Sequence, residues 1–227
     1  MKILPVDKGL VTFDIKWATD TAGPSPDNNM RTEMFLLGCK KAQQGNPCKG
    51  CFNSVTWDIG KAEHSRDPEE IADFIIKNAP NKYITIGGGE PTDQIEHLIP
   101  LVKKLKQAGF HIMMYTWRDL ERLLRNHPPY VMLSDFDFSI PISRSKVRHL
   151  LKYLDIVVDG QFIEEERLYQ QELGDGMLSS IGSGNQRIWD IKAMNDGDIF
   201  VYKYAMRDLA GLYIKPDTND LIYITKE

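Results

Sequence analysis

Apolar and polar positions alternate along the first two thirds of the chain in a way that predicts strands and helices in turn. Residues 34–37 form a short apolar run that predicts a buried strand ending at Gly38. Residues 67–70 predict a helix start, because an aspartate N-cap, a proline at the first helical position and acidic residues precede a periodic apolar face. Residues 82–86 are β-branched and aromatic, which is typical of a second strand.

The alternation continues after residue 90. Apolar residues at helical spacing between 95 and 105 predict a helix, and Gly109 ends it. The later expected elements are a strand over residues 110–115, helices over 117–126, 143–153 and 163–173, an irregular stretch over 127–142 and a strand over 154–158. Strands that alternate with helices predict an α/β fold with a parallel sheet, open or partly closed into a barrel.

The C-terminal part has a different pattern. Residues 199–204 and 221–225 alternate like strands, and Gly211 lies between them. We therefore expect a small antiparallel extension. The expected division is a main domain over residues 1–190 and a C-terminal β extension over 191–227 packed on the same domain.

Composition and charge limit the class of protein. The chain has 227 residues, enough for one domain with an appendage, and 26% charged residues, as in ordinary globular proteins. A net charge of −4 argues against a nucleic-acid partner, because such surfaces usually carry a basic excess. The N-terminus does not resemble a signal peptide and no apolar run is long enough to span a membrane, so we expect a cytoplasmic protein without a membrane partner.

Three cysteines, Cys39, Cys48 and Cys51, lie close together in the sequence and predict metal or redox chemistry rather than a disulfide framework. A structural zinc site needs four ligands, and His64 could be the fourth, although nothing in the spacing specifies it. A cubane iron–sulfur cluster normally takes four thiolates, so three would leave one iron open to a small molecule. From the cysteines alone, the cluster and the zinc site remain equal alternatives.

A glycine-rich turn, Gly88-Gly89-Glu90-Pro91, follows the strand predicted at residues 82–86. The carboxyl ends of parallel strands are where α/β proteins bind ligands, and glycines permit a close approach there. A carboxylate at this place could hold an ammonium group, whereas it would repel a phosphate. The same turn also occurs as plain structure, so by itself it does not establish a ligand site.

Together these motifs resemble the radical S-adenosylmethionine enzymes, in particular the activating proteins of anaerobic ribonucleoside-triphosphate reductases. The resemblance spans most of the chain and rests on these strings: Gly38-Cys39, Cys48-Lys49-Gly50-Cys51-Phe52-Asn53, Thr56-Trp57, Gly88-Gly89-Glu90-Pro91, Tyr115-Thr116-Trp117, residues 154–162 and Gly182-Ser183-Gly184-Asn185-Gln186-Arg187. This chain departs from the family in having eight residues between its first two cysteines, where the family usually has three, and in being longer than its compact members.

The resemblance implies a partial (βα) barrel of the radical S-adenosylmethionine type. It implies that the three cysteines ligate three irons of a [4Fe-4S] cluster and that S-adenosylmethionine chelates the fourth. Glu90 and the backbone near Gly88 and Gly89 would hold the amino group of S-adenosylmethionine, and Gly50 and Phe52 would lie against its nucleoside. No catalytic residue beyond the cluster and S-adenosylmethionine is implied.

The function implied is that of a glycyl-radical-enzyme activase. Reductive cleavage of S-adenosylmethionine would give a 5′-deoxyadenosyl radical that takes a hydrogen atom from a glycine of the partner, an anaerobic ribonucleoside-triphosphate reductase. A flavodoxin-type or similar protein would donate the electron. Two alternatives remain: a small-molecule enzyme of the 7-carboxy-7-deazaguanine synthase type, favoured by the long cysteine loop, and a zinc-binding module. The strings Asn185-Gln186-Arg187 and Thr56-Trp57 favour the activase.

Overall fold

The computed structural model describes residues 3–4, 9–10, 12–19, 30–61, 65–120, 142–169, 180–191, 199–205, 208–214 and 221–225. Within these residues, nine strands form one sheet in the order β11-β10-β9-β8-β7-β6-β5-β3-β2. Their bounds are β2 Thr12–Thr19, β3 Arg31–Leu36, β5 Tyr83–Gly88, β6 His111–Tyr115, β7 Ile156–Asp159, β8 Arg187–Asp190, β9 Ile199–Ala205, β10 Asp208–Ile214 and β11 Leu221–Thr225. A separate antiparallel pair joins β1 (Ile3–Leu4) to β4 (Ser65–Arg66).

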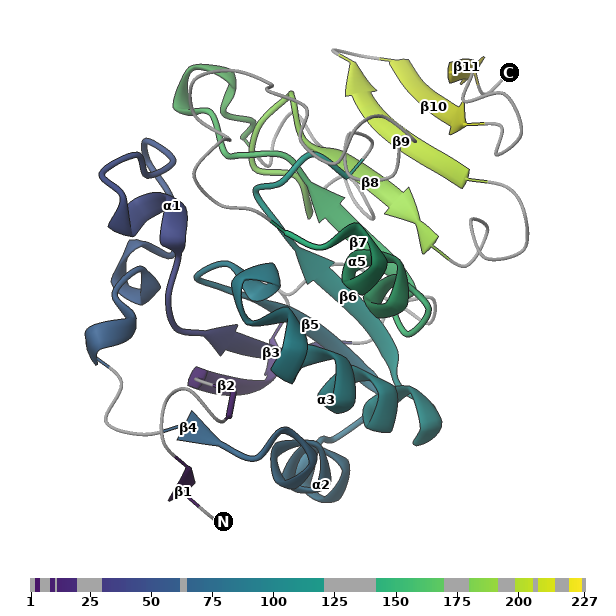
Figure 1. Ribbon diagram of the computed structural model, residues 1–227. Coiled ribbons are helices and arrows are strands. Elements are labelled where there is room, and N and C mark those ends of the chain that lie inside the picture. The colour runs from purple at the N-terminus through teal and green to yellow at the C-terminus, as the bar shows by residue number, and fades with distance from the viewer. Residues whose placement is uncertain are drawn as a thin grey trace.

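The centre of the large sheet is parallel. Strands β3, β5, β6 and β7 pair in parallel, and β2 and β8 pair with them in the antiparallel direction. Helices α2 (Pro68–Asn78), α3 (Ile95–Gln107) and α5 (Arg144–Leu151) alternate with these strands and lie over one face of the sheet (Figure 1). The predicted α/β class is confirmed. The sheet is open, with β2 and β11 at opposite ends of the strand order, as in a partial barrel.

An apolar layer lies between the helices and the sheet. Alternate residues of a strand point to the same face, so β5 and β6 direct one set of side chains toward the helices. The buried residues shared by strands and helices include Leu36, Ile84, Ile86, Ile112, Met114, Ile71, Ile75, Leu98, Leu101, Leu105 and Leu150. The residues that point to the other face form a smaller cluster with the chain near residue 181: Met113, Ile156, Val158, Ile181 and Ile188.

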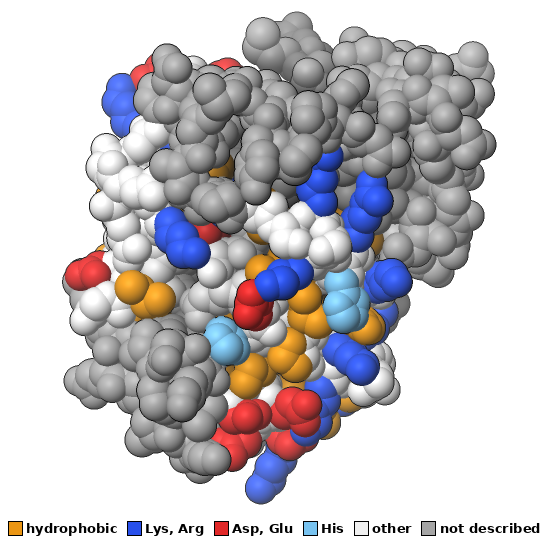
Figure 2. All heavy atoms as spheres, in the orientation of Figure 1, with side chains coloured by type: hydrophobic (Ala, Val, Ile, Leu, Met, Phe, Trp, Pro, Cys, Tyr) orange, Lys and Arg blue, Asp and Glu red, His pale blue; other side chains and the backbone are white. Residues whose placement is uncertain are grey.

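The outer surface of the helical layer carries charges of both signs. Figure 2 shows basic, acidic and hydrophobic side chains interspersed on this face. Neighbouring helices are joined there by ion pairs, such as Lys104 of α3 with Asp73 of α2 at 2.8 Å and Lys146 of α5 with Glu96 of α3. Such exposed pairs contribute little to stability. No helix in the described part of the chain is both long and apolar enough to cross a membrane.

The predicted helix starts are confirmed at atomic detail. The Asp67 carboxylate accepts hydrogen bonds from the amides of Glu69 and Glu70, and Pro68 is the first residue of α2. Ser143 caps α5 in the same way, through the amide of Lys146. Each cap satisfies backbone donors that have no partner inside the helix, which is why the helices begin at these residues.

The C-terminal strands continue the main sheet. Strand β8 pairs with β9, and β10 lies between β9 and β11, all antiparallel. The expected antiparallel extension is therefore present, but Gly211 does not separate two strands as predicted. It lies inside β10 because its backbone is paired on both sides, opposite Tyr202 and Ile224. The domain division at residue 190 stays a prediction.

Two expected helices differ from the prediction. The helix predicted at 117–126 does not begin at Trp117, because the Trp117 amide donates to Glu90 and the chain turns there. Helical structure starts at Leu120, whose amide donates to the Asp159 carboxylate at 2.6 Å, and most of residues 121–142 lie outside the described part of the chain. In the segment predicted as a helix at 163–173, the described residues contain only a 3-10 turn, η4 (Glu164–Glu166).

Candidate functional site

The three cysteines lie on a loop at the carboxyl end of β3. The loop begins at Gly38, whose φ is +102°, and two backbone hydrogen bonds close it: the amides of Gly38 and Cys39 donate to the carbonyls of Thr56 and Trp57 at 2.7 and 2.9 Å. Cys39 is buried, Cys48 and Cys51 are partly buried, and all three thiols are free. The loop therefore presents three potential ligands from one closed segment.

One cavity of about 710 Å³ lies against this loop. It is lined by all three cysteines, by the glycine-rich turn, by the ends of β5 and β6 and by the segment around residue 182. Its lining residues include Cys39, Cys48, Cys51, Phe52, Gly88, Gly89, Glu90, Trp117, Phe162, Gly182 and Gln186. Seven of these, Cys39, Cys48, Cys51, Phe52, Gly88, Gly89 and Glu90, are predicted site residues that the structure brings together.

Gly50 is the predicted site residue that does not line this cavity. Its φ is +75°, and a Cβ built on it would come within 1.8 Å of Glu164 Oε2. The neighbouring Phe52 does line the cavity and packs against Phe162 in a tilted arrangement, with ring centroids 4.8 Å apart. Gly50 thus permits a close approach between the cysteine loop and the turn η4, and its predicted contact with a nucleoside stays untested.

The glycines of the turn bring it against the cysteine loop. The amides of Gly89 and Glu90 donate to the carbonyls of Leu36 and Gly38, both at 2.8 Å. A Cβ on Gly88 would lie 2.5 Å from the Leu36 oxygen, and one on Gly89 would lie 2.1 Å from the Gly38 oxygen. No side chain fits at either place, so the turn and the base of the cysteine loop are held at backbone contact.

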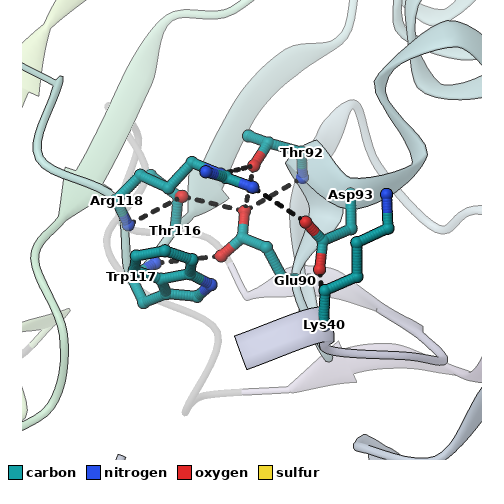
Figure 3. A network of polar contacts seen from close by, with 7 residues as sticks. All are labelled: Lys40, Glu90, Thr92, Asp93, Thr116, Trp117 and Arg118. Atoms are coloured by element: carbon teal, nitrogen blue, oxygen red, sulfur yellow. Dashed lines mark hydrogen bonds and ion pairs between the residues drawn. The ribbon is translucent and has the colours of Figure 1, made fainter. Parts of the chain in front are cut away.

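The Glu90 carboxylate is the centre of a buried polar network (Figure 3). Only 1% of the residue is exposed. Its Oε1 accepts hydrogen bonds from the Thr92 amide and from the hydroxyls of Thr92 and Thr116, and its Oε2 accepts one from the Trp117 amide at 3.0 Å. Burial raises the pKa of Glu90 and nearby Asp93 adds to this, whereas Arg118 and the hydrogen bonds lower it. A carboxylate oxygen has two lone pairs, so Oε2 can accept a further donor.

The network extends from Glu90 to the residue that follows Cys39. Arg118 donates to the Thr92 hydroxyl at 2.8 Å and pairs with Asp93 at 2.9 Å, and these two charged side chains are 6% and 5% exposed. The other oxygen of Asp93 accepts from the Lys40 amide at 2.7 Å (Figure 3). The pair of Arg118 and Asp93 was not predictable from the sequence, because its partners lie 25 residues apart and neither belongs to a recognised string.

The eight residues between Cys39 and Cys48 fold into a compact turn. They begin with the helix α1 (Lys40–Gln43), and Gly45 ends it with a φ of +82°. Lys41 is only 3% exposed: its ammonium donates to the Asn46 carbonyl at 2.6 Å and lies 5.7 Å from the centre of the Trp117 ring. All eight residues are described, and none of them lines the cavity.

Of the segment Asn185-Gln186-Arg187, only Gln186 lines the cavity. Gln186 accepts from the amides of Gly182 and Ser183 through its side-chain oxygen and donates to the Gly160 carbonyl. Arg187 pairs with Asp159 at 2.6 Å and with Asp119 at 2.7 Å. These contacts shape the wall and attach β8 to the end of β7. The arginine therefore has a structural role in the sheet.

The chemistry of the donor set fits a multi-iron cluster. Burial raises the pKa of the Cys39 thiol to about 12 and also raises that of Cys48, although Lys41 lowers the latter. Thiolates in such surroundings require a bound cation to stabilise their charge. Among the described residues, no group of three His, Cys, Asp or Glu side chains is arranged to bind a single metal ion. His64, the possible fourth zinc ligand, lies outside those residues. The three thiols instead share the wall of a cavity large enough for a cluster and a small molecule.

The fold and the cavity define an α/β protein in which three free cysteines and a glycine-rich turn line one cavity. A family model described as "4Fe-4S single cluster domain" matches residues 28–189. The chain therefore belongs to the 4Fe-4S single cluster domain family. This confirms the expected class, a radical S-adenosylmethionine enzyme, with a [4Fe-4S] cluster and S-adenosylmethionine as its cofactors.

Curated proteins resemble the chain over a similar span. It is 26% identical over 167 residues to the anaerobic ribonucleoside-triphosphate reductase-activating protein of Haemophilus influenzae. This match covers 71% of this chain and 88% of that protein. It is 26% identical over 163 residues to the protein of the same name from Vibrio cholerae, covering 70% and 86%. It is 30% identical over 99 residues to the pyruvate formate-lyase-activating enzyme of Listeria monocytogenes, covering 41% and 38%.

Proposed function

We propose that this protein is a glycyl-radical-enzyme activase whose partner is an anaerobic ribonucleoside-triphosphate reductase. The observation that carries the proposal is the single cavity in which three free cysteines face the turn Gly88–Glu90. The likeness to reductase-activating proteins along 88% of the Haemophilus protein supports the choice of partner. A flavodoxin-type electron donor remains a prediction.

The residues of the cavity have separate roles in this proposal. Cys39, Cys48 and Cys51 would each ligate one iron, and the fourth iron would bind S-adenosylmethionine. The bound cluster supplies the electron that cleaves the sulfonium bond of S-adenosylmethionine. Glu90 can accept one more hydrogen bond at Oε2, which suits an ammonium donor, and Phe52 provides an apolar surface for a nucleoside.

The protein itself would position the ligand and exclude water from it. The Glu90 network holds the turn against the cysteine loop, so the amino-group acceptor and the iron ligands keep a constant separation. Phe162 and Gly182 close the other side of the cavity. Exclusion of water from the bound ligand would protect a reactive radical from side reactions with solvent.

The length of the cysteine loop was the sequence feature that favoured a small-molecule synthase. The structure of this loop does not support that alternative. Lys41 lies over the Trp117 ring, and none of residues 40–47 lines the cavity. The loop therefore adds no surface for a small substrate, and the argument from loop length loses its force.

The test uses the purified full-length protein under anaerobic conditions. After reconstitution with iron and sulfide, we expect about four irons per chain and cleavage of S-adenosylmethionine on reduction. After mixing with a purified anaerobic ribonucleoside-triphosphate reductase, electron paramagnetic resonance should show a glycyl radical on the reductase. Cys48→Ala is the control and should give neither. Cleavage without a glycyl signal would reject the activase, and a protein that holds only zinc would reject both enzyme functions.

A further inference from the structure

Lys41 is the lysine of α1 that is directed into the protein. It is 3% exposed, whereas its neighbour Lys40 is exposed. The hydrogen bond to the Asn46 carbonyl at 2.6 Å and the face of the Trp117 ring hold its side chain in place. The first contact lies within the turn formed by residues 40–47, and the second joins this turn to the segment that follows β6.

The buried ammonium of Lys41 has no carboxylate partner within ion-pair distance in the described part of the chain. A carbonyl oxygen and an indole ring compensate only part of the cost of burying a charge. The nearby buried Arg118 differs, since it pairs with Asp93. A nearby negative charge would therefore stabilise this ammonium.

The cysteines can supply that negative charge. Lys41 belongs to the loop that carries all three cysteines, and its ammonium lies over the ring of Trp117, which lines the same cavity as the three cysteines. A [4Fe-4S] cluster on three thiolates is anionic, and reduction by one electron adds a further negative charge. The lysine therefore lies where this charge would develop.

We propose that Lys41 is a positioning residue whose buried ammonium is the counter-charge of the iron–sulfur cluster and raises its reduction potential. The proposal rests on the cysteines being cluster ligands, but it does not depend on the partner enzyme. A fixed cation beside the cluster stabilises the reduced form more than the oxidised form, because the reduced form carries more negative charge. The residues between Cys39 and Cys48 thus tune the cluster without lining the cavity.

The experiment compares Lys41→Met, Lys41→Arg and Lys40→Met after anaerobic reconstitution. A redox titration with dithionite as the electron donor, followed by electron paramagnetic resonance of the reduced cluster, gives the midpoint potential without S-adenosylmethionine or a reductase. At a fixed solution potential, the ratio of reduced to oxidised cluster should fall about tenfold in Lys41→Met, which corresponds to about 59 mV for a one-electron couple. Lys41→Arg and Lys40→Met should each change the ratio less than about twofold, because the first keeps the charge and the second removes an exposed charge.

The outcomes separate this proposal from the proposed function. The role of the charge is overturned if the midpoint potential shifts no more in Lys41→Met than in Lys40→Met. It is also overturned if Lys41→Arg shifts the potential as much as Lys41→Met does. Neither result argues against the cluster itself. If Lys41→Met does not retain iron, retention by Lys41→Arg supports the counter-charge, and loss in both variants overturns it in favour of packing. A wild-type protein that binds no cluster rejects the proposed function before any variant is compared.

Discussion

The cavity has two walls of different construction. The inner wall consists of the turn around Glu90 and the end of β6, and its charged groups, Arg118 and Asp93, are almost completely buried. The outer wall consists of Phe52 and the segment near η4, and its ion pairs are open to solvent: in Lys49–Glu165 the side chains are 78% and 65% exposed. Phe52 itself is 62% exposed.

This difference assigns different tasks to the two walls. The inner wall joins three strand ends by hydrogen bonds that water cannot replace, so a change there should affect folding as well as function. The outer wall makes contacts whose loss water can compensate, so a change there should affect ligand binding with little effect on stability. The following predictions test this separation, in order of decreasing expected effect.

The largest effect should come from Arg118→Leu. This change leaves the buried Asp93 without its ion-pair partner, and we expect a loss of about 3 kcal/mol in the free energy of unfolding. Chemical denaturation of the iron-free protein measures it. Arg167→Leu is the matched control on the outer wall, where Arg167 pairs with Glu164 at 3.0 Å and stacks on Phe52. It should cost less than about 1 kcal/mol, and equal losses would contradict the distinction between the walls.

Gly89→Ala should have the next largest effect. The new methyl group would lie 2.1 Å from the Gly38 oxygen, so the turn must move away from the cysteine loop at a cost of about 2 kcal/mol. We expect weaker retention of iron as well, measured as iron content after gel filtration. Gly45→Ala, with a φ of +82° and open space around it, should cost about 1 kcal/mol and keep its iron. Loss of iron in both variants would show that backbone strain in the loop, rather than contact with the turn, explains the effect.

Phe52→Ala should separate binding from stability. Because Phe52 is largely exposed but lines the cavity, we expect less than about 1 kcal/mol of lost stability. The dissociation constant of S-adenosylmethionine, measured by anaerobic calorimetry on the reconstituted protein, should rise about tenfold. Val55→Ala, exposed on the same loop but away from the cavity wall, should leave binding unchanged. An unchanged affinity in Phe52→Ala would remove this residue from the binding site.

Lys49→Gln should have the smallest effect. Its pair with Glu165 is exposed, and salt screens such pairs, so we expect no measurable change in the unfolding midpoint at physiological ionic strength. Thermal denaturation of wild type and variant side by side is sufficient. A clear loss would mean that the outer wall contributes to stability in the same way as the inner wall.

Local signals in the sequence predicted the elements that depend on neighbouring residues. The N-cap at Asp67, the apolar periodicity of α3 and the β-branched and aromatic residues of β5 act over a few positions, and the structure confirms each of these elements. The cysteines and the glycine–glutamate turn were also found from the sequence, because their spacing and the resemblance to a family identify them.

Contacts between distant residues were not predictable in this way. Arg118 and Asp93 come from different strand ends, and nothing in their local sequence shows that they will be buried together. The same is true of Lys41, which is buried beside Trp117 although nothing in its local sequence indicates this. The predicted start of the helix after β6 was wrong for a related reason, because the Trp117 amide donates a hydrogen bond to the distant Glu90 carboxylate.

The most direct test of the account is whether one iron of the cluster is open to S-adenosylmethionine. The reconstituted, reduced protein should contain about four irons per chain, and its electron paramagnetic resonance signal should change in shape when S-adenosylmethionine is added. A signal of the same shape with and without S-adenosylmethionine, in a protein that carries a full complement of iron, would contradict a three-cysteine cluster with an open coordination site.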